Sequence, residues 1–409
     1  MEKRLGIYIH IPFCASKCSY CDFYSLAGCN NLMPKYQNAL LAHIAESEAS
    51  FAPCYIDSIY FGGGTPSYYG ARRICEIFNA LKRTGKVLKS AEVTVEVNPD
   101  SISLRDLKLL RKEGVNRLSI GVQSANDDIL KLIGRRHNFK QAEKAVSNAR
   151  RAGFDNVSID LIYGLPSQTK SDWADTLGKA LALKPEHISC YGLKLEEGVP
   201  MKERYEGSPF LPGDDEQADM YLYAVETLER YGYAQYEISN FCLPGHESRH
   251  NLKYWNLEDY MGFGPGAHSC VGNVRYSYIA DLKGYISGVF EGKNIINEYE
   301  RIDKMERAAE YLMLGLRRAY GISREEYQSI YRGDFDVIEE LLREFEKKGW
   351  ARQNGDRWSL TASGFLLSNI LIGALLEAQA KQRMSLSPWA KNPLENPGSE
   401  AALSYDARR

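Results

Sequence analysis

The chain has 409 residues, and its 51 Lys and Arg nearly balance its 53 Asp and Glu, for a formal net charge of −2. This balance argues against a nucleic-acid-binding protein, because such proteins carry an excess of basic residues. The length allows one large domain and a smaller one. Nine cysteines without regular pairing, and an N-terminus without an apolar signal core, predict a cytoplasmic protein with reduced thiols.

Short β-rich segments alternate with helical segments in the first half of the chain. The predicted strands cover residues 5–10, 56–61, 92–97, 117–122, 156–161 and 187–192. The predicted helices between them cover residues 36–51, 71–83, 104–112, 140–151 and 172–183. Six consecutive strand–helix units predict an α/β fold in which a parallel sheet curls into a partial, TIM-like (β/α)6 barrel.

Three cysteines, Cys14, Cys18 and Cys21, follow the first predicted strand. Their Cys-x3-Cys-x2-Cys spacing differs from that of four-cysteine ferredoxins, and a zinc site would need a fourth ligand nearby. A redox pair of Cys18 and Cys21 would leave Cys14 without a role, and a structural disulfide is not expected without a secretory leader. Three thiolates can hold three irons of a four-iron cluster and leave the fourth iron open to a ligand.

Other polar residues also follow predicted strands. Residues 62–66 read Gly-Gly-Gly-Thr-Pro after the second strand, Glu96 and Asn98 end the third, Gln123 the fourth and Asp160 the fifth. The carboxyl ends of barrel strands are where such folds keep their active sites. The glycine tract would let the backbone approach a small polar ligand, although a tight turn explains it equally well.

These side chains suggest how a ligand would be bound. Glu96 can accept hydrogen bonds from a ribose or an ammonium group, with Gln123 as an amide partner. Asp160 and Arg135 can bind a ribose and a carboxylate, although solvated or ion-paired surface positions are the alternative. Tyr8 precedes the cysteines on the first strand and is either a core aromatic or a ring at the cluster site.

A second group of residues, 249–255, reads Arg-His-Asn-Leu-Lys-Tyr-Trp. His250 is a candidate haem ligand, because histidine commonly ligates haem iron and nearby aromatics can stack on a flat macrocycle. The alternative is a histidine that is merely packed or hydrogen-bonded. His268, in the glycine-rich run 262–269, is a second candidate, although those glycines can simply form a turn.

The second half of the chain has a different pattern. Residues 214–231 predict a long helix, and residues 303–376 predict three helical segments with a β-hairpin at 350–360, as in a winged-helix-like module. The apolar run 364–376 is too short to span a bilayer and predicts a buried helix. The expected divisions are a barrel at 1–235, a connecting region at 236–302, the winged-helix-like domain at 303–376 and a disordered tail at 377–409.

The chain resembles the radical S-adenosylmethionine (SAM) superfamily, and within it the coproporphyrinogen dehydrogenase-like branch that includes haem chaperones of the HemW type. The resemblance runs from about residue 5 to residue 376. It is carried by Tyr-x-His-Ile-Pro-Phe-Cys-x3-Cys-x-Tyr-Cys-Asp-Phe at 8–23, Phe-Gly-Gly-Gly-Thr-Pro at 61–66, Gly-Val-Gln-Ser at 121–124 and Ile-Asp-Leu-Ile-Tyr-Gly-Leu-Pro at 159–166.

The resemblance implies a [4Fe–4S] cluster on the three cysteines, with SAM bound to the open iron and cleaved by one electron. The residues that would line this SAM are Tyr8, Tyr20, Gly63, Gly64, Thr65 and Glu96. The dehydrogenase binds a second SAM, for which the matching positions here are Gln123, Arg135 and Asp160. The dehydrogenase also has a longer N-terminal arm than the seven residues that precede Tyr8 here, and a further cysteine where this chain has Phe23.

Both departures argue against decarboxylation of coproporphyrinogen. In contrast, the residues His250, Asn251, Tyr254 and Trp255 match the haem-binding signature of the HemW type. The resemblance therefore implies a haem chaperone that delivers haem to apo-haemoproteins and needs an electron donor, with oxygen-independent coproporphyrinogen III dehydrogenation as the alternative. It leaves open whether SAM is turned over, whether the protein forms a homodimer, and whether it contacts a membrane peripherally.

Overall fold

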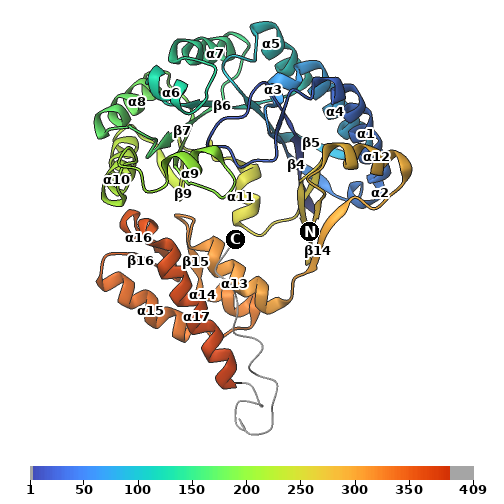
Figure 1. The fold of residues 1–409 in the computed structure, drawn as a ribbon. Coiled ribbons are helices and arrows are strands. Elements are labelled where there is room, and N and C mark those ends of the chain that lie inside the picture. Colours follow the sequence, from blue (N-terminus) through green and yellow to red (C-terminus); the bar gives the residue numbers. More distant parts are fainter. Residues whose placement is uncertain (1–2, 387–409) are drawn as a thin grey trace. The chain divides into compact units, whose positions relative to one another are not determined.

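The computed structural model describes residues 3–386, with side chains described up to residue 382. The chain divides into two compact units, Met1–Asp303 and Lys304–Arg409. In the first unit, strands are surrounded by an outer ring of helices (Figure 1). No helix among the described residues is long and apolar enough to cross a membrane.

The six predicted strands are all present and parallel. They are β1 (Arg4–Ile11), β4 (Tyr55–Gly63), β5 (Lys86–Val97), β6 (Arg117–Gln123), β7 (Val157–Tyr163) and β8 (His187–Gly192). Each pairs in parallel with the next in this order. The predicted α/β fold with a partial barrel is therefore confirmed.

Three of the connecting helices begin at side-chain caps. The helices are α1 (Met33–Glu46), α2 (Glu48–Phe51), α4 (Ala71–Thr84), α5 (Leu104–Glu113), α7 (Phe139–Arg151) and α8 (Lys170–Ala182). Ser103, Asn138 and Thr169 each form a capping box that holds the first free N–H groups of α5, α7 and α8. Gly114 ends α5 with φ of 114°, a conformation that favours glycine.

The predicted connecting region 236–302 is wrong, because these residues extend the sheet itself. They form half of β9 (Ala234–Glu237), and all of β10 (Asn240–Cys242), β11 (Tyr260–Phe263), β12 (His268–Val271), β13 (Val274–Tyr278) and β14 (Ile296–Arg301). Within residues 3–386 the sheet has twelve strands in the order β14-β13-β12-β11-β1-β4-β5-β6-β7-β8-β10-β9. Strand β11 pairs in parallel with β1, so a seventh parallel strand joins the barrel. These strands are too short to show a clear period in sequence.

Shorter elements complete the first unit. They are β2 (Phe13–Cys14), β3 (Leu26–Ala27), η1 (Asn30–Leu32), α3 (Pro66–Tyr69), α6 (Asp127–Leu132), α9 (Pro200–Tyr205), α10 (Asp214–Arg230), α11 (Arg249–Trp255) and α12 (Leu282–Glu291). Helix α11 is important for the site. It packs against Gly6 and Ser58 in the N-terminal halves of β1 and β4, below the carboxyl ends of the strands.

The second unit is mainly helical, with a small sheet. Its elements are α13 (Lys304–Gly315), β15 (Ile322–Ser323), α14 (Arg324–Glu326), η2 (Tyr327–Tyr331), α15 (Asp336–Lys347), β16 (Ala351–Asn354), β17 (Arg357–Leu360), α16 (Ala362–Leu366) and α17 (Ser368–Leu386). The predicted hairpin is β16–β17, and β15 pairs with β17.

The predicted start of the disordered tail, at residue 377, is too early. Helix α17 continues to Leu386, because residues 376–386 are rich in Ala, Leu, Glu, Gln, Lys and Arg, which favour helices. The first proline of the tail is Pro388. The rest of the predicted tail, residues 387–409, lies outside the described residues.

Candidate functional site

The three cysteines of the Cys-x3-Cys-x2-Cys motif face one cavity of about 350 Å³. Cys14 ends β2, and its Sγ lies 3.3 Å from Oγ1 of Thr65. Cys18 Sγ lies 3.8 Å from the guanidinium of Arg135. Burial raises the pKa of the Cys14 and Cys21 thiols. All three cysteines are free, and the Arg135 guanidinium lies beside Cys18.

This arrangement fits a cluster better than a single ion. Among the residues that the structure describes, no three His, Cys, Asp or Glu side chains come together closely enough to hold one metal ion. A cubic cluster binds each thiolate to a different iron, so its three cysteines need not converge on one point. Three thiols around one cavity, with no fourth cysteine among the residues that line it, therefore match a four-iron cluster with one open iron.

The glycine tract after β4 packs tightly against the loop that carries Cys14. A Cβ on Gly64 would lie 2.8 Å from the carbonyl oxygen of Ile11, and a Cβ on Gly63 would lie 2.5 Å from the ring of His10. Backbone hydrogen bonds join Gly64 to Ile11 and Thr65 to Phe13, each 2.8 Å long. Gly63, Gly64 and Thr65 also line the cavity. The tract therefore makes a tight turn and also forms part of the cavity wall, and its contact with a ligand stays a prediction.

Two buried carboxylates line the cavity opposite the cysteine loop. Glu96 accepts a hydrogen bond of 2.9 Å from the hydroxyl of Tyr60, and burial raises the pKa of Glu96 to about 7. Asp160 accepts hydrogen bonds from Ser119 at 3.0 Å and Ser189 at 2.8 Å, and burial also raises the pKa of Asp160. Both carboxylates can accept further hydrogen bonds from hydroxyl or ammonium groups of a ligand.

Most of the predicted SAM-site residues line this cavity, but not all. Those that do are Tyr20, Gly63, Gly64, Thr65, Glu96, Gln123, Arg135, Asp160 and the three cysteines. Arg135 donates to the Gly121 carbonyl at 2.6 Å and to Asn98, so protein groups already hold its guanidinium in place. Tyr8 lies behind the cavity wall, stacked on Tyr60 with ring centroids 6.3 Å apart.

Sequence reasoning missed the deeper part of the cavity, which is lined by the buried side chains of Arg117 and His187. Arg117 is only 2% exposed, and its Nε has no hydrogen-bond partner in the described part of the chain. Burial lowers the pKa of Arg117, but Glu92 and Tyr60 more than offset this, so the pKa is raised. The signal in the sequence is polar residues at alternate strand positions, which place one polar face inside the barrel.

The residues of the predicted haem motif lie on α11. His250 is fully buried; its Nδ1 lies 2.9 Å from the Ser58 hydroxyl, and its Nε2 lies 2.9 Å from the Tyr254 hydroxyl. Burial lowers the pKa of His250 to about 3, so the imidazole is neutral. The Glu92 carboxylate accepts hydrogen bonds from the backbone N–H of Arg249 and His250, each at 3.0 Å. Iron ligation by His250 would therefore require the hydrogen bond at the ligating ring nitrogen to break, while the other nitrogen could keep its partner.

The other motif residues differ in position. Asn251 lines the cavity, whereas Tyr254 and Trp255 are half-buried on α11 and are not among the lining residues. His268, the second candidate ligand, begins β12 and is exposed. Because it follows the turn after β11, it lies at the carboxyl edge of the sheet.

The fold and the three-cysteine cavity define a protein of the radical SAM class. The family model of the Radical SAM superfamily matches residues 8–180, and that of the HemN C-terminal domain matches residues 302–367. The heme chaperone HemW of Bacillus subtilis is 36% identical over 372 residues, which cover 90% of this chain and 98% of that protein. The heme chaperone HemW of Lactococcus lactis is 36% identical, with coverage of 90% and 96%. The chain belongs to the HemW family.

Among solved structures, the coproporphyrinogen III oxidase HemN from Escherichia coli, a radical SAM enzyme, superposes with a TM-score of 0.81. It is 25% identical, and the match covers 91% of this chain and 90% of that chain. Membership of the radical SAM class implies a [4Fe–4S] cluster on Cys14, Cys18 and Cys21, with SAM on its open iron. When reduced, such a cluster supplies one electron to the sulfonium of SAM.

Proposed function

We propose that this protein binds haem and delivers it to apo-haemoproteins, with a [4Fe–4S] cluster and SAM in the cavity described above. The observation that carries the proposal is the similarity to HemW proteins along nearly their whole length, 98% of the Bacillus subtilis protein. The HemN oxidase shares the fold at a lower identity of 25%. Chaperone function is therefore preferred to dehydrogenation of coproporphyrinogen.

The chain's own residues would orient SAM rather than react with it. Glu96 and Asp160 would accept hydrogen bonds from its amino and ribose groups, and the backbone of residues 63–65 would contact its methionine end. Gln123 and Arg135 also line the cavity. Because Glu96, Asp160 and Arg135 are held by protein hydrogen bonds, they would bind the ligand with little loss of side-chain entropy.

The rim of the cavity has the chemistry that a haem requires. Phe23 and Tyr191 line the rim and are 64% and 40% exposed, so that a flat macrocycle could stack on them. Lys17 and Lys194 line the same rim and are exposed. The Lys17 ammonium, which donates to the Phe23 carbonyl, could pair with a propionate, whereas Lys194 would first have to leave its ion pair with Glu196. A surface that combines exposed aromatics with lysines suits an amphipathic tetrapyrrole.

The two predicted iron ligands, His268 and His250, differ in how readily they could bind iron. His268 is exposed and could reach an incoming iron without breaking a contact described here, so we assign it the first ligation. His250 stays a prediction, since it could bind iron only after the hydrogen bond at one ring nitrogen, to Ser58 or to Tyr254, opens. Asn251 would contact a ligand at the cavity floor, while Tyr254 and Trp255 would hold its helix.

Paired assays on anaerobically reconstituted protein test the proposal. We expect stoichiometric haem binding, transfer of haem to apo-myoglobin, and no protoporphyrinogen from coproporphyrinogen III with SAM and reductant. Several turnovers of decarboxylation would instead establish the dehydrogenase. His268→Ala should weaken haem binding at least about tenfold. Retention of haem affinity in His268→Ala with its loss in His250→Ala would reassign the ligand.

The rim has its own matched pair of variants. Phe23→Ser should weaken haem binding, because it removes an exposed ring at the cavity mouth. Phe210→Ser is the control, since Phe210 is 62% exposed but does not line the cavity. Equal haem affinities in the two variants would reject stacking at the rim.

A further inference from the structure

The cavity continues from the cysteine loop to a polar floor inside the barrel. Arg117 begins β6, six residues before Gln123 ends the same strand, and both residues line the cavity. On β8, His187 is the first residue and Ser189 follows on the same face, and both also line the cavity. The floor therefore lies below the carboxyl ends of the strands, which carry the cluster loop and the glycine tract.

The guanidinium of Arg117 lacks a protein partner at this floor. Arg117 is 2% exposed, its Nε has no hydrogen-bond partner, and no ion pair joins it to another side chain among residues 3–382. By contrast, the half-buried Arg135 donates to the Gly121 carbonyl at 2.6 Å, and the half-buried Arg150 forms an ion pair of 2.8 Å with Glu186. A buried charge is costly unless acceptors surround it, so the unpartnered guanidinium indicates a ligand.

Carboxylates near Arg117 act on it only through space. Glu92 accepts its hydrogen bonds from two backbone N–H groups of α11, each at 3.0 Å. Asp160 lines the cavity, and among the described residues its Oδ2 accepts only from Ser119, at 3.0 Å, so an acceptor position stays open. A free cation and a carboxylate with spare capacity therefore face one space. This mixed lining selects neither an anion nor a cation as such, but a molecule that carries a carboxylate beside a hydrogen-bond donor.

We propose that the cavity floor binds a small hydroxy- or amino-carboxylic acid, whose carboxylate pairs with Arg117 and whose hydroxyl or amino group donates to Asp160. The guanidinium presents its N–H groups in a planar fork that matches the two oxygens of a carboxylate. A phosphate would bring a second negative charge close to Asp160 and Glu96, which disfavours it. The inference concerns a ligand additional to SAM and does not rest on haem transfer.

Matched small molecules test the proposal on the wild-type protein. Lactate and alanine carry both groups, propionate carries only the carboxylate, and lactamide has no charge. Calorimetry on anaerobically reconstituted, SAM-loaded protein should show that lactate or alanine binds more tightly than propionate, and at least about tenfold more tightly than lactamide. Equal affinities for lactate and propionate would reject the contact with Asp160. Failure of both lactate and alanine to bind at millimolar concentrations, or equal binding of lactate and lactamide, would overturn the site.

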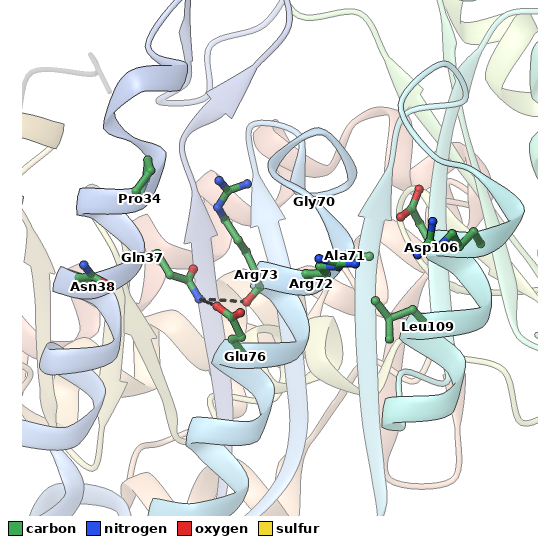
Figure 2. Close-up of a pocket in the computed structure, with 11 residues that line it drawn as sticks. Pro34, Gln37, Asn38, Gly70, Ala71, Arg72, Arg73, Glu76, Asp106 and Leu109 are labelled. Atoms are coloured by element: carbon green, nitrogen blue, oxygen red, sulfur yellow. Dashed lines mark hydrogen bonds between the residues drawn. The ribbon is translucent and has the colours of Figure 1, made fainter.

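Substitution of Arg117 separates a binding role from a structural one. Arg117→Met should lose the preference for lactate over lactamide, whereas Arg117→Lys, which keeps the charge without the fork, should keep part of it. Arg72→Met is the control, because Arg72 is exposed and lines the groove beside α4 (Figure 2). Since Arg117 has no partner to lose, Arg117→Met should not lower the melting temperature of the ligand-free protein. A much lower melting temperature with unchanged lactate affinity would make Arg117 structural and overturn the proposal.

Competition identifies the molecule that supplies the carboxylate. We expect lactate to bind equally well with and without saturating SAM, and equally well with and without haem. If SAM abolished lactate binding, Arg117 would bind the carboxylate of SAM itself. If haem displaced lactate and haem dimethyl ester did not, Arg117 would bind a propionate. Either result would overturn a separate small acid at the floor. Loss of haem transfer with normal lactate binding would instead count against the proposed function alone.

Discussion

His250 lies nearly parallel to Tyr60, with ring centroids 5.4 Å apart and planes 25° from parallel. The Tyr60 hydroxyl in turn donates a hydrogen bond to Glu96 in the cavity. The motif helix α11 and the carboxylate expected to bind SAM are therefore connected through one tyrosine. Substitution of His250 should therefore affect the cavity, even though His250 does not line it.

We expect His250→Ala to lower the free energy of unfolding by about 3 kcal/mol, because it leaves a cavity and two buried hydroxyls, of Ser58 and Tyr254, without a partner. SAM affinity should fall as well, because Tyr60, which donates a hydrogen bond to Glu96, loses the His250 ring on which it stacks. The exposed His268→Ala is the control and should change stability by less than about 0.5 kcal/mol. Anaerobic urea unfolding measures both, and equal stabilities would show that the buried contacts of His250 contribute little.

Glu96→Gln should weaken SAM binding about tenfold or more, because a hydrogen bond to a charged group contributes roughly 1.5–3 kcal/mol. Burial raises the pKa of Glu96 to about 7, so the carboxylate is protonated below this pH and ionised above it. SAM affinity of the wild-type protein should therefore rise between pH 6 and pH 8. Titrations that show the same pH dependence in Glu96→Gln would assign it to another group. Iron and sulfide content should not change.

Glu237, which does not line the cavity, should make the free energy of unfolding depend on pH in the same range. Burial raises the pKa of Glu237 to about 7, from 4.5. A carboxyl group whose folded pKa is raised favours the folded state at low pH, and this contribution is lost as the pH rises from 4.5 to 7. Glu237→Gln should therefore stabilise the protein by up to about 3 kcal/mol at pH 8 and have almost no effect at pH 4.5.

Glu298→Gln, an exposed change on β14, is the matched control for Glu237→Gln. It should leave unfolding unchanged at both pH values. A stability gain for Glu237→Gln that is the same at pH 4.5 and pH 8 would contradict the assignment of the effect to ionisation.

Gly321→Ala should unfold the second unit. The glycine has φ of +70°, and a Cβ would lie 1.9 Å from the carbonyl oxygen of Trp358, where β15 pairs with β17. We expect a loss of more than about 3 kcal/mol and rapid proteolysis between residues 304 and 386. Gly355→Ala, with φ of +62° and open space around its Cβ, should cost only about 1 kcal/mol. Similar proteolysis of the two variants would show that the close approach at Gly321 is tolerated.

Local signals explain what could be predicted. The parallel strands β1, β4 and β5 are rich in β-branched and aromatic residues, and the cysteine spacing lies within eight residues, Cys14 to Cys21. Strands β10, β11 and β12 have three or four residues each, so the pairing partner decides their structure. Such partners are distant in sequence and leave no local period.

The sequence alone determined the three-cysteine spacing, the alternation of strands and helices, and the family, because each is encoded by short spacings that folding preserves. Only the tertiary structure decided the role of the motif histidine. Ser58 lies 192 residues before His250, and their hydrogen bond exists only because the barrel brings β4 against α11. Burial of the imidazole, and of Arg117 beneath the cavity, likewise depends on closure of the sheet, since solvent exclusion is a property of the assembled fold and not of any one segment.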